Sequence, residues 1–268
     1  MAVTAIDDQE FSLFQKLIYQ LAGINLSSAK KALVSGRLAK RLVQYNLDSY
    51  GDYFKLLTAS HNSTELQVAV DLLTTNETYF FREPKHFDFL RTQILAKHKP
   101  GNPFRVWSAA CSSGEEPYSI AMVLADHLGD SPWEVVASDI STRVLGKARS
   151  GHYPMDRTEG ISREHLYRYC LKGVASQDNT LLVNKTLRDR VNFMQVNLNQ
   201  PLPGLGGFDV IFLRNVMIYF DQETKRQIVQ RMLPLLKQEG HLLIGHSESL
   251  NGVVDTLHPL APSIYRKP

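Results

Sequence analysis

The sequence predicts an α/β protein in which an all-α N-terminal domain precedes a mostly parallel β-sheet with helices on both faces. From about Asp7 to Leu73 the chain carries apolar side chains at the three- and four-residue spacing of helices. After Pro103, short β-branched or apolar runs alternate with amphipathic segments. Strands that alternate with helices imply a parallel sheet that is covered by helices on both faces.

The N-terminal part is expected to contain several short helices. In the first one, apolar residues recur at positions i, i+3, i+4 and i+7, and Gly23 follows as a stop. These apolar residues are Phe14, Leu17, Ile18 and Leu21. The caps expected for the later helices are Ser27 or Ser28, Ser49 and Asn62. The apolar faces of these helices carry Leu38 and Leu42, then Tyr50, Tyr53, Phe54 and Leu57, then Leu66, Ala69, Val70 and Leu73.

The part after Pro103 is expected to form the sheet. Its predicted strands are Phe104–Ala109, Trp133–Ser138, Val191–Val196, Phe208–Leu213 and His241–His246, with Ser263–Lys267 as a further candidate. Its predicted helices are Glu115–Leu128, Ser141–Arg149, Ser162–Leu171 and Gln222–Leu236. Gly173–Asn184 fits neither pattern and predicts a small inserted hairpin, which is either a partner-binding insertion or a plain connector. Sheets of this kind bind ligands at the carboxyl ends of their strands.

Composition narrows the class of protein. The 268 residues are 43% hydrophobic and 21% charged, which excludes a disordered chain. Lys and Arg number 30 against 27 Asp and Glu, so a net charge of +3 does not indicate a dedicated nucleic-acid binder. The acidic opening Met1–Glu10 and the lack of a long apolar run predict a cytoplasmic protein. Cys111 and Cys170 are expected to be reduced structural thiols.

The first predicted strand leads through a loop of very small residues into a helix, over residues 106–119. Such a loop lets a ligand approach the backbone N–H groups at the helix start. Gly114 is the only glycine in it, so it is neither the dinucleotide fingerprint nor a phosphate loop. Glu115 and Glu116 would repel a pyrophosphate and favour a cationic or neutral cofactor, unless they only complement the helix dipole.

The second predicted strand ends at Asp139. An acidic residue at this place can accept both hydroxyl groups of a ribose. It can instead cap the next helix, a position for which Ser141 competes. Together with the small-residue loop, Asp139 favours an adenosine ligand.

Four segments of the chain resemble the motifs of CheR-type chemotaxis receptor methyltransferases, and the match covers nearly the whole chain. The segments are Thr74–Glu83, Ala109–Ser119, Leu213–Asp221 and Gly245–Glu248. The resemblance implies an S-adenosylmethionine-dependent, Rossmann-like class I methyltransferase with a small antiparallel β-subdomain. It implies a helical domain over 1–75, a linker and helix over 76–103, and a methyltransferase domain over 104–268 with the insert near 171–186.

The resemblance also implies the activity and its site. The enzyme would esterify glutamate side chains on the cytoplasmic signalling helices of chemoreceptors and release S-adenosylhomocysteine, with no metal. The residues that the resemblance assigns to the site are Asn76, Thr78, Arg82, Glu116, Asp139, Asn197, Leu198, Arg214, Asn215 and Tyr219.

Elementary chemistry suggests roles for these side chains. A glutamate carboxylate is already deprotonated near neutral pH, so methyl transfer from a sulfonium needs alignment and not a general base. Arg82 or Arg214 can guide a carboxylate, and Tyr219 can shape the methyl channel or simply pack beside Phe220. Asn76 and Thr78 suit the methionine end of the cofactor, and Asn197 can pair with an adenine edge.

The predicted helix Lys30–Tyr45 has basic residues and no acidic one. Its cations are Lys30, Lys31, Arg37, Lys40 and Arg41. They would attract acidic receptor helices, or they form an ordinary solvated face. A receptor C-terminal tether could bind the β-insert, and a monomer suffices for the mechanism.

Other functions fit less well. DNA amino-methyltransferases carry an Asp/Asn-Pro-Pro-aromatic turn where this chain has residues 214–217, Arg-Asn-Val-Met. A catalytically silent adaptor would not need both ribose and methionine contacts. Residues 245–249 lack the final glycine of a nucleophile elbow, which disfavours a serine hydrolase. His241 and His246 lack a convincing set of metal ligands, and His246 is expected to be structural.

Overall fold

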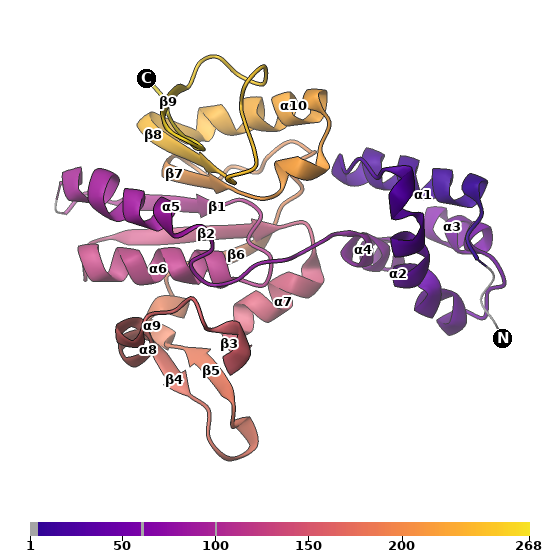
Figure 1. The fold of residues 1–268 in the computed structure, drawn as a ribbon, viewed down its shortest axis with the longest axis horizontal. Helices are drawn as coiled ribbons and strands as arrows, with labels where there is room; N and C mark the ends of the chain where they lie inside the picture. The colour runs from indigo at the N-terminus through magenta and orange to yellow at the C-terminus, as the bar shows by residue number, and fades with distance from the viewer. Residues whose placement is uncertain (1–4, 60–61, 100) are drawn as a thin grey trace.

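The protein is described by a computed structural model over residues 5–59, 62–99 and 101–268, so residues 1–4 and 60–61 of the predicted helical domain lie outside the description. Figure 1 shows a helical domain at one end, a sheet with helices on both faces, and a small antiparallel sheet beside it. This arrangement confirms the predicted fold class.

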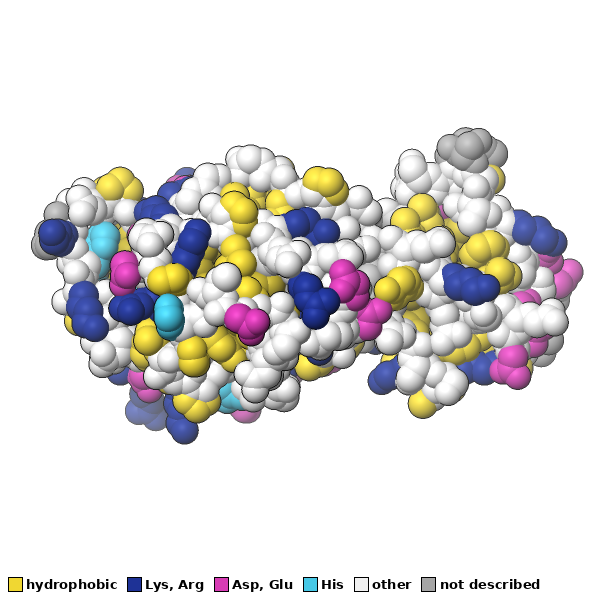
Figure 2. All heavy atoms as spheres, turned by 90° about the horizontal axis from the view of Figure 1, so that it is seen from above, with side chains coloured by type: hydrophobic (Ala, Val, Ile, Leu, Met, Phe, Trp, Pro, Cys, Tyr) yellow, Lys and Arg dark blue, Asp and Glu magenta, His cyan; other side chains and the backbone are white. Residues whose placement is uncertain are grey.

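No helix among the described residues is long and apolar enough to cross a membrane. In Figure 2 positive and negative side chains intermingle on the visible face.

The helical domain holds four α-helices around a core of its own. They are α1 (Asp8–Ala22), α2 (Lys31–Gln44), α3 (Tyr50–Thr58) and α4 (Ser63–Leu73). The Asp7 carboxylate accepts from the N–H of Glu10, and the Glu10 carboxylate accepts from the N–H of Asp7, which fixes the start of α1. Gly23 ends α1 at φ 71°, as predicted.

Ser49 caps its helix as expected, whereas Ser27 and Asn62 stand at N-cap positions without a side-chain cap bond. The Ser49 hydroxyl accepts from the N–H of Asp52 at 3.0 Å and caps α3. Ser27 makes no side-chain cap bond, because the 3₁₀ turn Ser28–Lys30 precedes α2. Asn62 stands before α4, but its amide donates to the Leu56 carbonyl at 2.9 Å.

The main sheet has seven strands in the order β6-β2-β1-β7-β8-β10-β9. They are β1 (Phe104–Ser108), β2 (Trp133–Asp139), β6 (Val191–Gln195), β7 (Phe208–Leu213), β8 (Leu236–Ile244), β9 (His258–Ala261) and β10 (Ile264–Arg266). The first five of that order are parallel, and β10 runs antiparallel to both of its neighbours. Strand β8 begins before the predicted His241 and β9 was not predicted, because both segments are mostly polar or exposed and show no apolar alternation.

Helices cover the two faces of this sheet (Figure 1). They are α5 (Pro84–Phe89), α6 (Glu115–Leu128), α7 (Thr142–Ser150) and α10 (Gln222–Met232). Two further helices, α8 (Arg163–Tyr169) and α9 (Lys185–Arg188), lie beyond α6 beside the small antiparallel sheet. A π-helical segment, Leu90–Ile94, and a 3₁₀ turn, Leu95–Lys97, extend α5. Short 3₁₀ turns also lie at Met155–Arg157, Ala175–Gln177, Met217–Tyr219 and Leu233–Leu235. Helix α6 matches its predicted bounds, and α8 ends early because Cys170 enters a strand.

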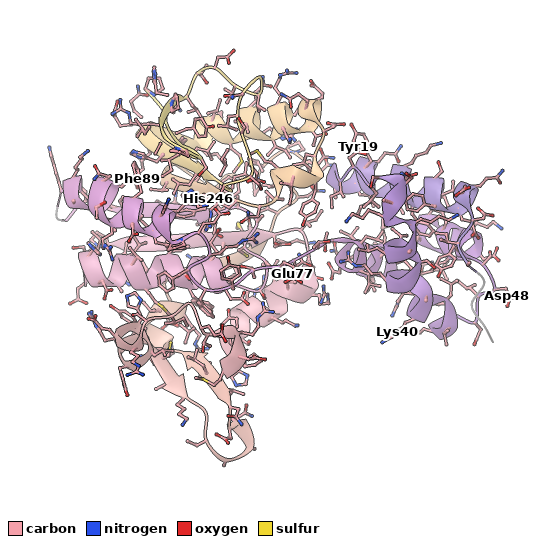
Figure 3. The ribbon with its side chains drawn as sticks, in the orientation of Figure 1. Tyr19, Lys40, Asp48, Glu77, Phe89 and His246 are labelled. Atoms are coloured by element: carbon pink, nitrogen blue, oxygen red, sulfur yellow. The ribbon has the colours of Figure 1, made fainter. Side chains whose placement is uncertain are left out.

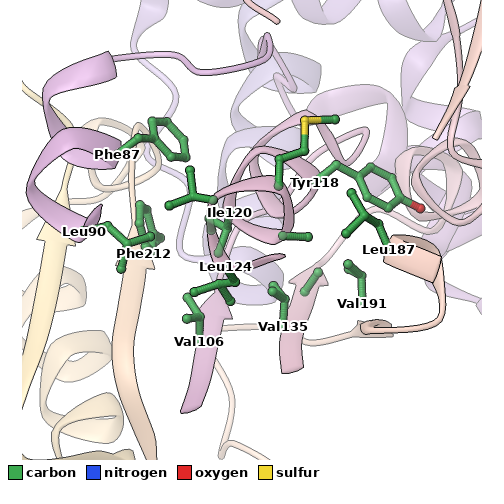
Figure 4. Close-up of a cluster of buried hydrophobic side chains, with 14 of the residues drawn as sticks. Phe87, Leu90, Val106, Tyr118, Ile120, Leu124, Val135, Leu187, Val191 and Phe212 are labelled. Atoms are coloured by element: carbon green, nitrogen blue, oxygen red, sulfur yellow. The ribbon is translucent and has the colours of Figure 1, made fainter. Parts of the chain in front are cut away.

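Successive side chains of each strand point to opposite faces of the sheet and belong to two separate apolar cores. On β1, Val106 packs with α5 and α6 on one face, and Trp107 packs with α10 on the other. Figure 4 shows the first of these cores, where Phe87 and Ile120 meet Val106 and Phe212. The sheet is therefore rigid on both faces, and its strand ends hold the polar groups that follow them.

The small sheet is inserted between β2 and β6 of the main sheet. Its strands are β3 (His152–Pro154), β4 (Cys170–Lys172) and β5 (Thr180–Val183), in the antiparallel order β3-β5-β4. The hairpin of β4 and β5 confirms the predicted insert, whereas β3 was not predicted because three residues carry too little pattern. Cys170 of this sheet and Cys111 are both free thiols, as expected.

Candidate functional site

A cavity opens at the carboxyl ends of β1, β2, β6 and β7, between the main sheet and the helical domain. The segment 74–79 and Arg82 line one side of it, and Ala22 and Ile24 reach it from the end of α1. The structure brings all of the predicted site residues to this one cavity. They are Asn76, Thr78, Arg82, Glu116, Asp139, Asn197, Leu198, Arg214, Asn215 and Tyr219.

The loop between β1 and α6 approaches α7 and β3 closely at Gly114. Gly114 has φ 97°, and a Cβ there would lie 2.8 Å from the Tyr153 hydroxyl and 2.9 Å from the Ala148 Cβ. Ser112 also has a positive φ of 49°, and its hydroxyl donates to the Asn76 carbonyl at 2.7 Å. Only small side chains of this loop face the cavity, which leaves room for a ligand.

Asp139 ends β2 at the cavity wall. One of its oxygens accepts from the N–H of Ser112 and the other from the N–H of Ser141, both at 2.9 Å. Burial raises the pKa of Asp139, while these backbone donors act in the opposite direction. Ser141 and not Asp139 caps α7, through the N–H of Val144. Asp139 is thus fixed in orientation, and each oxygen keeps a second lone pair for a ligand.

Asn197 follows β6 and lines the cavity, but its amide is already bonded. The Nδ2 atom donates to the Leu21 carbonyl at the end of α1 at 2.6 Å, and Oδ1 accepts from the N–H of Asn199 at 2.9 Å. The amide thus joins the main sheet to the last turn of α1, where carbonyls lack helical partners. The amide keeps a second N–H and a second lone pair, so its pairing with an adenine edge stays a prediction. The neighbouring Leu198 adds a buried apolar side chain to the wall.

A buried charge cluster of Glu83, Glu116 and Arg214 lies beside the cavity. Arg214 has a side chain 1% exposed and binds Glu83 at 3.0 Å and Glu116 at 2.9 Å. It also donates to the carbonyl of Arg82. Because two carboxylates already occupy the guanidinium, Arg214 is the less available of the two arginines predicted as carboxylate guides.

The two acids of this cluster respond differently to burial. Burial raises the pKa of Glu116, against the opposing effects of Arg214 and of the Ser108 hydroxyl. Burial also acts to raise the pKa of Glu83, but Arg214, the Asn215 amide and the His246 N–H together lower it to about 2. Glu83 is therefore the fixed anion at the centre of the cluster. Its pairing with Arg214 was not predicted, although Glu83 ends the first of the matching segments.

The two acids at the start of α6 both have cationic partners within the protein. Glu115 binds Arg157 at 2.9 Å, and Glu116 binds Arg214. Cations of the protein itself thus neutralise both acids. Of the two acids, only Glu116 lines the cavity.

Arg82 is the more available of the two predicted arginines. It lies half-buried at the cavity, donates to the Glu77 carbonyl at 2.8 Å, and stacks 5.7 Å from the centroid of the Tyr79 ring. These partners are neutral, so Arg82 keeps its charge for a ligand. Among the arginines that line the cavity, Arg82 therefore fits the predicted carboxylate guide.

Tyr219 lies in the 3₁₀ turn after β7. Its ring packs against the apolar core that contains Phe220, and it also lines the cavity. The packing alternative of the sequence analysis is confirmed, and the role in a methyl channel stays a prediction. Burial raises the pKa of the Tyr219 hydroxyl, while the charges of Arg82 and Arg37 oppose the shift. The hydroxyl is therefore neutral near neutral pH.

Glu248 holds the turn that carries Asn215 and Tyr219. One oxygen accepts from the N–H of Asn215 at 2.9 Å and of Gly245 at 2.6 Å, and the other from Ile218 at 3.2 Å. Asn215 has a left-handed φ of 57°. Sequence reasoning placed Glu248 in a matching segment without a role. An acidic residue just after a strand, next to small polar residues, was the signal available.

His246 is near other polar groups and not isolated. Its ring lies 4.8 Å from the His86 ring, and ligand atoms of Glu83, His86 and His246 lie within 4.8 Å of one another. Burial, followed by the charge of Arg214, lowers the pKa of His86 to about 3. The cation beside Glu83 in this structure is the guanidinium of Arg214.

The predicted basic face of α2 is only partly free. Lys31 binds Asp8 at 2.7 Å and Arg41 binds Glu65, while Arg37 donates to the carbonyls of Leu73 and Thr74. The exposed cations among the predicted five are Lys30 and Lys40. In Figure 3 Lys40 projects from the helical domain, whereas Glu77 lies on the connecting segment, residues 74–83, which joins α4 to α5.

Comparison with known families gives two matches that cover most of the chain. Residues 9–74 match the family described as "CheR methyltransferase, all-alpha domain". Residues 76–264 match the family described as "CheR methyltransferase, SAM binding domain". Together they span the helical domain, the cavity and the main sheet.

Curated proteins of similar sequence share one description, "Chemotaxis protein methyltransferase". The protein of Salmonella typhimurium is 44% identical over 264 residues, which cover 97% of this chain and 91% of that protein. The protein of Escherichia coli is 45% identical over 252 residues, which cover 92% of this chain and 86% of that protein. That of Borreliella burgdorferi is 38% identical over 273 residues, covering 98% of this chain and 95% of the other.

Proposed function

This chain belongs to the CheR methyltransferase family and uses S-adenosylmethionine, and from this premise we propose that it is a protein-glutamate O-methyltransferase of chemoreceptors. It would convert glutamate carboxylates on receptor signalling helices into methyl esters and release S-adenosylhomocysteine. The observation that carries the proposal is the convergence of Asp139, Arg82 and Tyr219 on one cavity between the two domains.

The donor set of the cavity fits an adenosyl compound. The oriented Asp139 carboxylate can accept the two ribose hydroxyls, and Ile140, Val196 and Leu198 offer apolar surface for a purine. Asn76 and Thr78 present short polar groups from the connecting segment to the methionine end. When bound, S-adenosylmethionine supplies a methyl group activated by a positive sulfur.

The residues of the chain align the acceptor and need not move a proton. A glutamate carboxylate is ionised near neutral pH and can attack directly. The C–O bond forms as the C–S bond breaks, leaving an ester and a neutral thioether. Arg82 holds the acceptor carboxylate, or that of the cofactor, through forked hydrogen bonds. Tyr219 narrows the channel, so that an oxygen approaches the methyl carbon in line with the sulfur.

The small sheet has an open edge that can bind the C-terminal tether of a receptor. Strand β4 is at the edge of the order β3-β5-β4, so one side of its backbone is open to an added strand. Leu171 and Val174 beside it are 56% and 75% exposed. We propose that an extended C-terminal segment of a receptor pairs here. Such a partner lies in the cytoplasm, where we expect the protein to act as a monomer.

The activity is tested with methyl-labelled donor, the purified chain and receptor membranes. Label on receptor protein that base releases as methanol supports the proposal. Label on added nucleic acid, or no label at all while the chain binds S-adenosylhomocysteine in calorimetry, contradicts it and favours the two alternatives considered above.

The role of Arg82 is tested by Arg82→Ala. Loss of a charged hydrogen-bonding partner should lower kcat/KM about 10- to 100-fold, and Arg82→Lys should recover part of it. The control is Arg91→Ala, since Arg91 is an exposed residue paired with Asp88 beyond α5. Weaker S-adenosylhomocysteine binding would assign Arg82 to the cofactor carboxylate, and a raised receptor KM would assign it to the acceptor. Unchanged values of both would remove Arg82 from the site.

A further inference from the structure

The start of helix α7 is capped by a side chain of the helical domain. The N–H groups of Thr142 and Arg143 donate to the Asp71 carboxylate of α4 at 3.0 and 3.1 Å. The Thr142 hydroxyl donates to the same carboxylate at 2.8 Å. The Ser141 hydroxyl accepts from the third N–H of the turn, that of Val144. Asp71 thus satisfies the two N–H groups of the first turn that Ser141 leaves without an acceptor.

Asp71 places a negative charge where α7 has none of its own. Helix α7 carries no acidic residue in its first turn, so a carboxylate from another element complements the positive end of its dipole. Asp71 is 5% exposed. With the Gln67 amide, which donates at 2.8 Å, four neutral donors reach its carboxylate. Figure 1 shows α4 on the side of the helical domain that faces α7.

The turn before α7, residues 139–142, also orients Asp139. One Asp139 oxygen accepts from the N–H of Ser141 at 2.9 Å, and Thr142 follows directly. A shift of Thr142 would therefore move the N–H that orients Asp139. Burial raises the pKa of Asp139, and the charge of Asp71 acts in the same direction. Asp71 thus affects Asp139 in two opposite ways, because it holds the turn but also repels the second carboxylate.

Helix α4 holds this turn at a second point. The Ile140 carbonyl accepts from the Gln67 amide of α4 and from the Gln195 amide at the end of β6, both at 3.1 Å. The Gln195 amide also donates to the Gln67 oxygen at 2.8 Å. The Ile140 residue lines the cavity. The path of the turn is therefore fixed by side chains of the helical domain on both sides of Ser141.

We propose that Asp71 is a positioning residue of the cofactor site. By capping α7 from the helical domain, it holds residues 139–142 in the arrangement in which Asp139 accepts the two ribose hydroxyls. This inference rests on the proposed function only in placing the ribose at Asp139. It makes the helical domain a part of the cofactor site. Because coupling between two events is reciprocal, a bound cofactor should in turn strengthen the contact of α4 with α7.

The decisive variant is Asp71→Asn. It keeps the size of the side chain, but its amide group must face N–H groups that now donate to a carboxylate. The Kd of S-adenosylhomocysteine, measured by calorimetry, should rise about tenfold. The KM for receptor should stay within about twofold, since Arg82 and Tyr219 are not touched. If repulsion of Asp139 were the main effect of Asp71, the Kd would stay the same or fall, and the proposal would be overturned.

The matched control is Glu65→Gln. Glu65 lies on the same helix, is also 5% exposed, and accepts hydrogen bonds from Arg41, Tyr45 and Tyr53 within the helical domain. Thermal unfolding sets a temperature at which both variants are folded. Both should unfold more easily than the wild type, but only Asp71→Asn should lose affinity for S-adenosylhomocysteine. Equal losses in the two variants would show a general effect of stability and overturn the proposal.

A second variant keeps the test open if Asp71→Asn does not fold. Gln67→Leu keeps a side chain of similar length on a half-buried residue and removes the bonds to Asp71 and to the Ile140 carbonyl. The Kd of S-adenosylhomocysteine should rise about three- to fivefold. A wild-type Kd in Gln67→Leu would contradict the idea that α4 positions the turn.

A ligand comparison separates this inference from the proposed function. The probes are S-adenosylhomocysteine and its analogue without the two ribose hydroxyls. The tenfold loss in Asp71→Asn should shrink to about twofold for the analogue, because the analogue lacks the groups that Asp139 accepts. Equal losses for both ligands, or equal binding of both by the wild type, would refute the role of Asp71. No receptor takes part in this assay, so a failure to methylate receptor glutamates would refute the proposed function alone.

Discussion

The charge cluster of Glu83, Glu116 and Arg214 lies beside the cavity, whereas a second groove, lined by Arg37, Arg143 and Lys147, lies along the same connecting segment. Charged side chains are paired and buried in the cluster but mostly exposed in the groove. In the cluster, Arg214 is 1% exposed and bound by both Glu83 and Glu116. In the groove, Arg143 and Lys147 are exposed and face neutral oxygens or solvent. A paired and buried charge fixes geometry, because its partners cannot move without leaving an uncompensated ion. An exposed and unbalanced charge stays available for a partner.

The same difference separates the two arginines predicted as carboxylate guides, because Arg214 is paired with carboxylates and Arg82 has neutral partners. Both Arg82 and Arg214 line the cavity. Arg214 lies at the end of a central strand, where burial demands counterions close by. Arg82 lies on the connecting segment, where a half-buried guanidinium can keep neutral partners.

The largest effect on the free energy of unfolding is expected when a substitution breaks the charge cluster. Arg214→Met leaves Glu83 and Glu116 buried without a counterion, and we expect the free energy of unfolding to fall by about 3–5 kcal/mol. Lys147→Met in the groove should change it by less than about 0.5 kcal/mol. Urea unfolding of both variants measures the contrast. Similar values for the two would show that pairing in the cluster does not stabilise the fold.

A smaller effect is expected at Glu248, whose carboxylate accepts hydrogen bonds from backbone N–H groups. In Glu248→Gln, the new amide group must face an N–H of Gly245, Asn215 or Ile218, because all three now donate to the carboxylate. The free energy of unfolding should fall by about 1–3 kcal/mol. Binding of S-adenosylhomocysteine should weaken with it, since the same turn carries Asn215. The control is Glu77→Gln, at an exposed residue, which should unfold like the wild type. A Glu248→Gln variant with wild-type stability and normal S-adenosylhomocysteine binding would show that Glu248 does not hold the turn.

The smallest expected effect is a dependence of the free energy of unfolding on pH. His86 is neutral in the fold with a pKa of about 3, against an ordinary value of about 6.5. A lowered pKa means that the unfolded chain binds the proton first, so the contribution of His86 is complete above pH 6.5 and is lost as the pH falls towards 3. The slope is at most about 1.4 kcal/mol per pH unit.

His86→Gln should flatten this slope between pH 6.5 and 5. The slope will not vanish, because His241 also has a pKa lowered to about 4 by burial and by the charge of Arg266. Glu83, with a pKa of about 2, adds its own loss only below its ordinary value near 4.5. Urea unfolding at a series of pH values measures the slopes, and identical slopes in the two proteins would contradict a buried neutral His86.

Much of this protein follows from short-range sequence patterns. The apolar spacing of Phe14 and Ile18 gives α1, and the stop at Gly23 follows from its left-handed backbone. The strand Phe208–Leu213 and the helix Glu115–Leu128 have their predicted bounds, because each is a strongly patterned buried element. Motif residues at strand ends converge on the cavity because parallel strands end at one edge of their sheet.

Only the tertiary structure decided which of these side chains are available. No local pattern says that the Asn197 amide would bind the end of α1, or that Arg214 would lie between Glu83 and Glu116, since these partners are far apart in the sequence. The same holds for the groove, whose walls come from α2 and α7. The physical reason is that periodicity reports burial within one element, whereas the pairing of charges and amides depends on which elements the packing brings together.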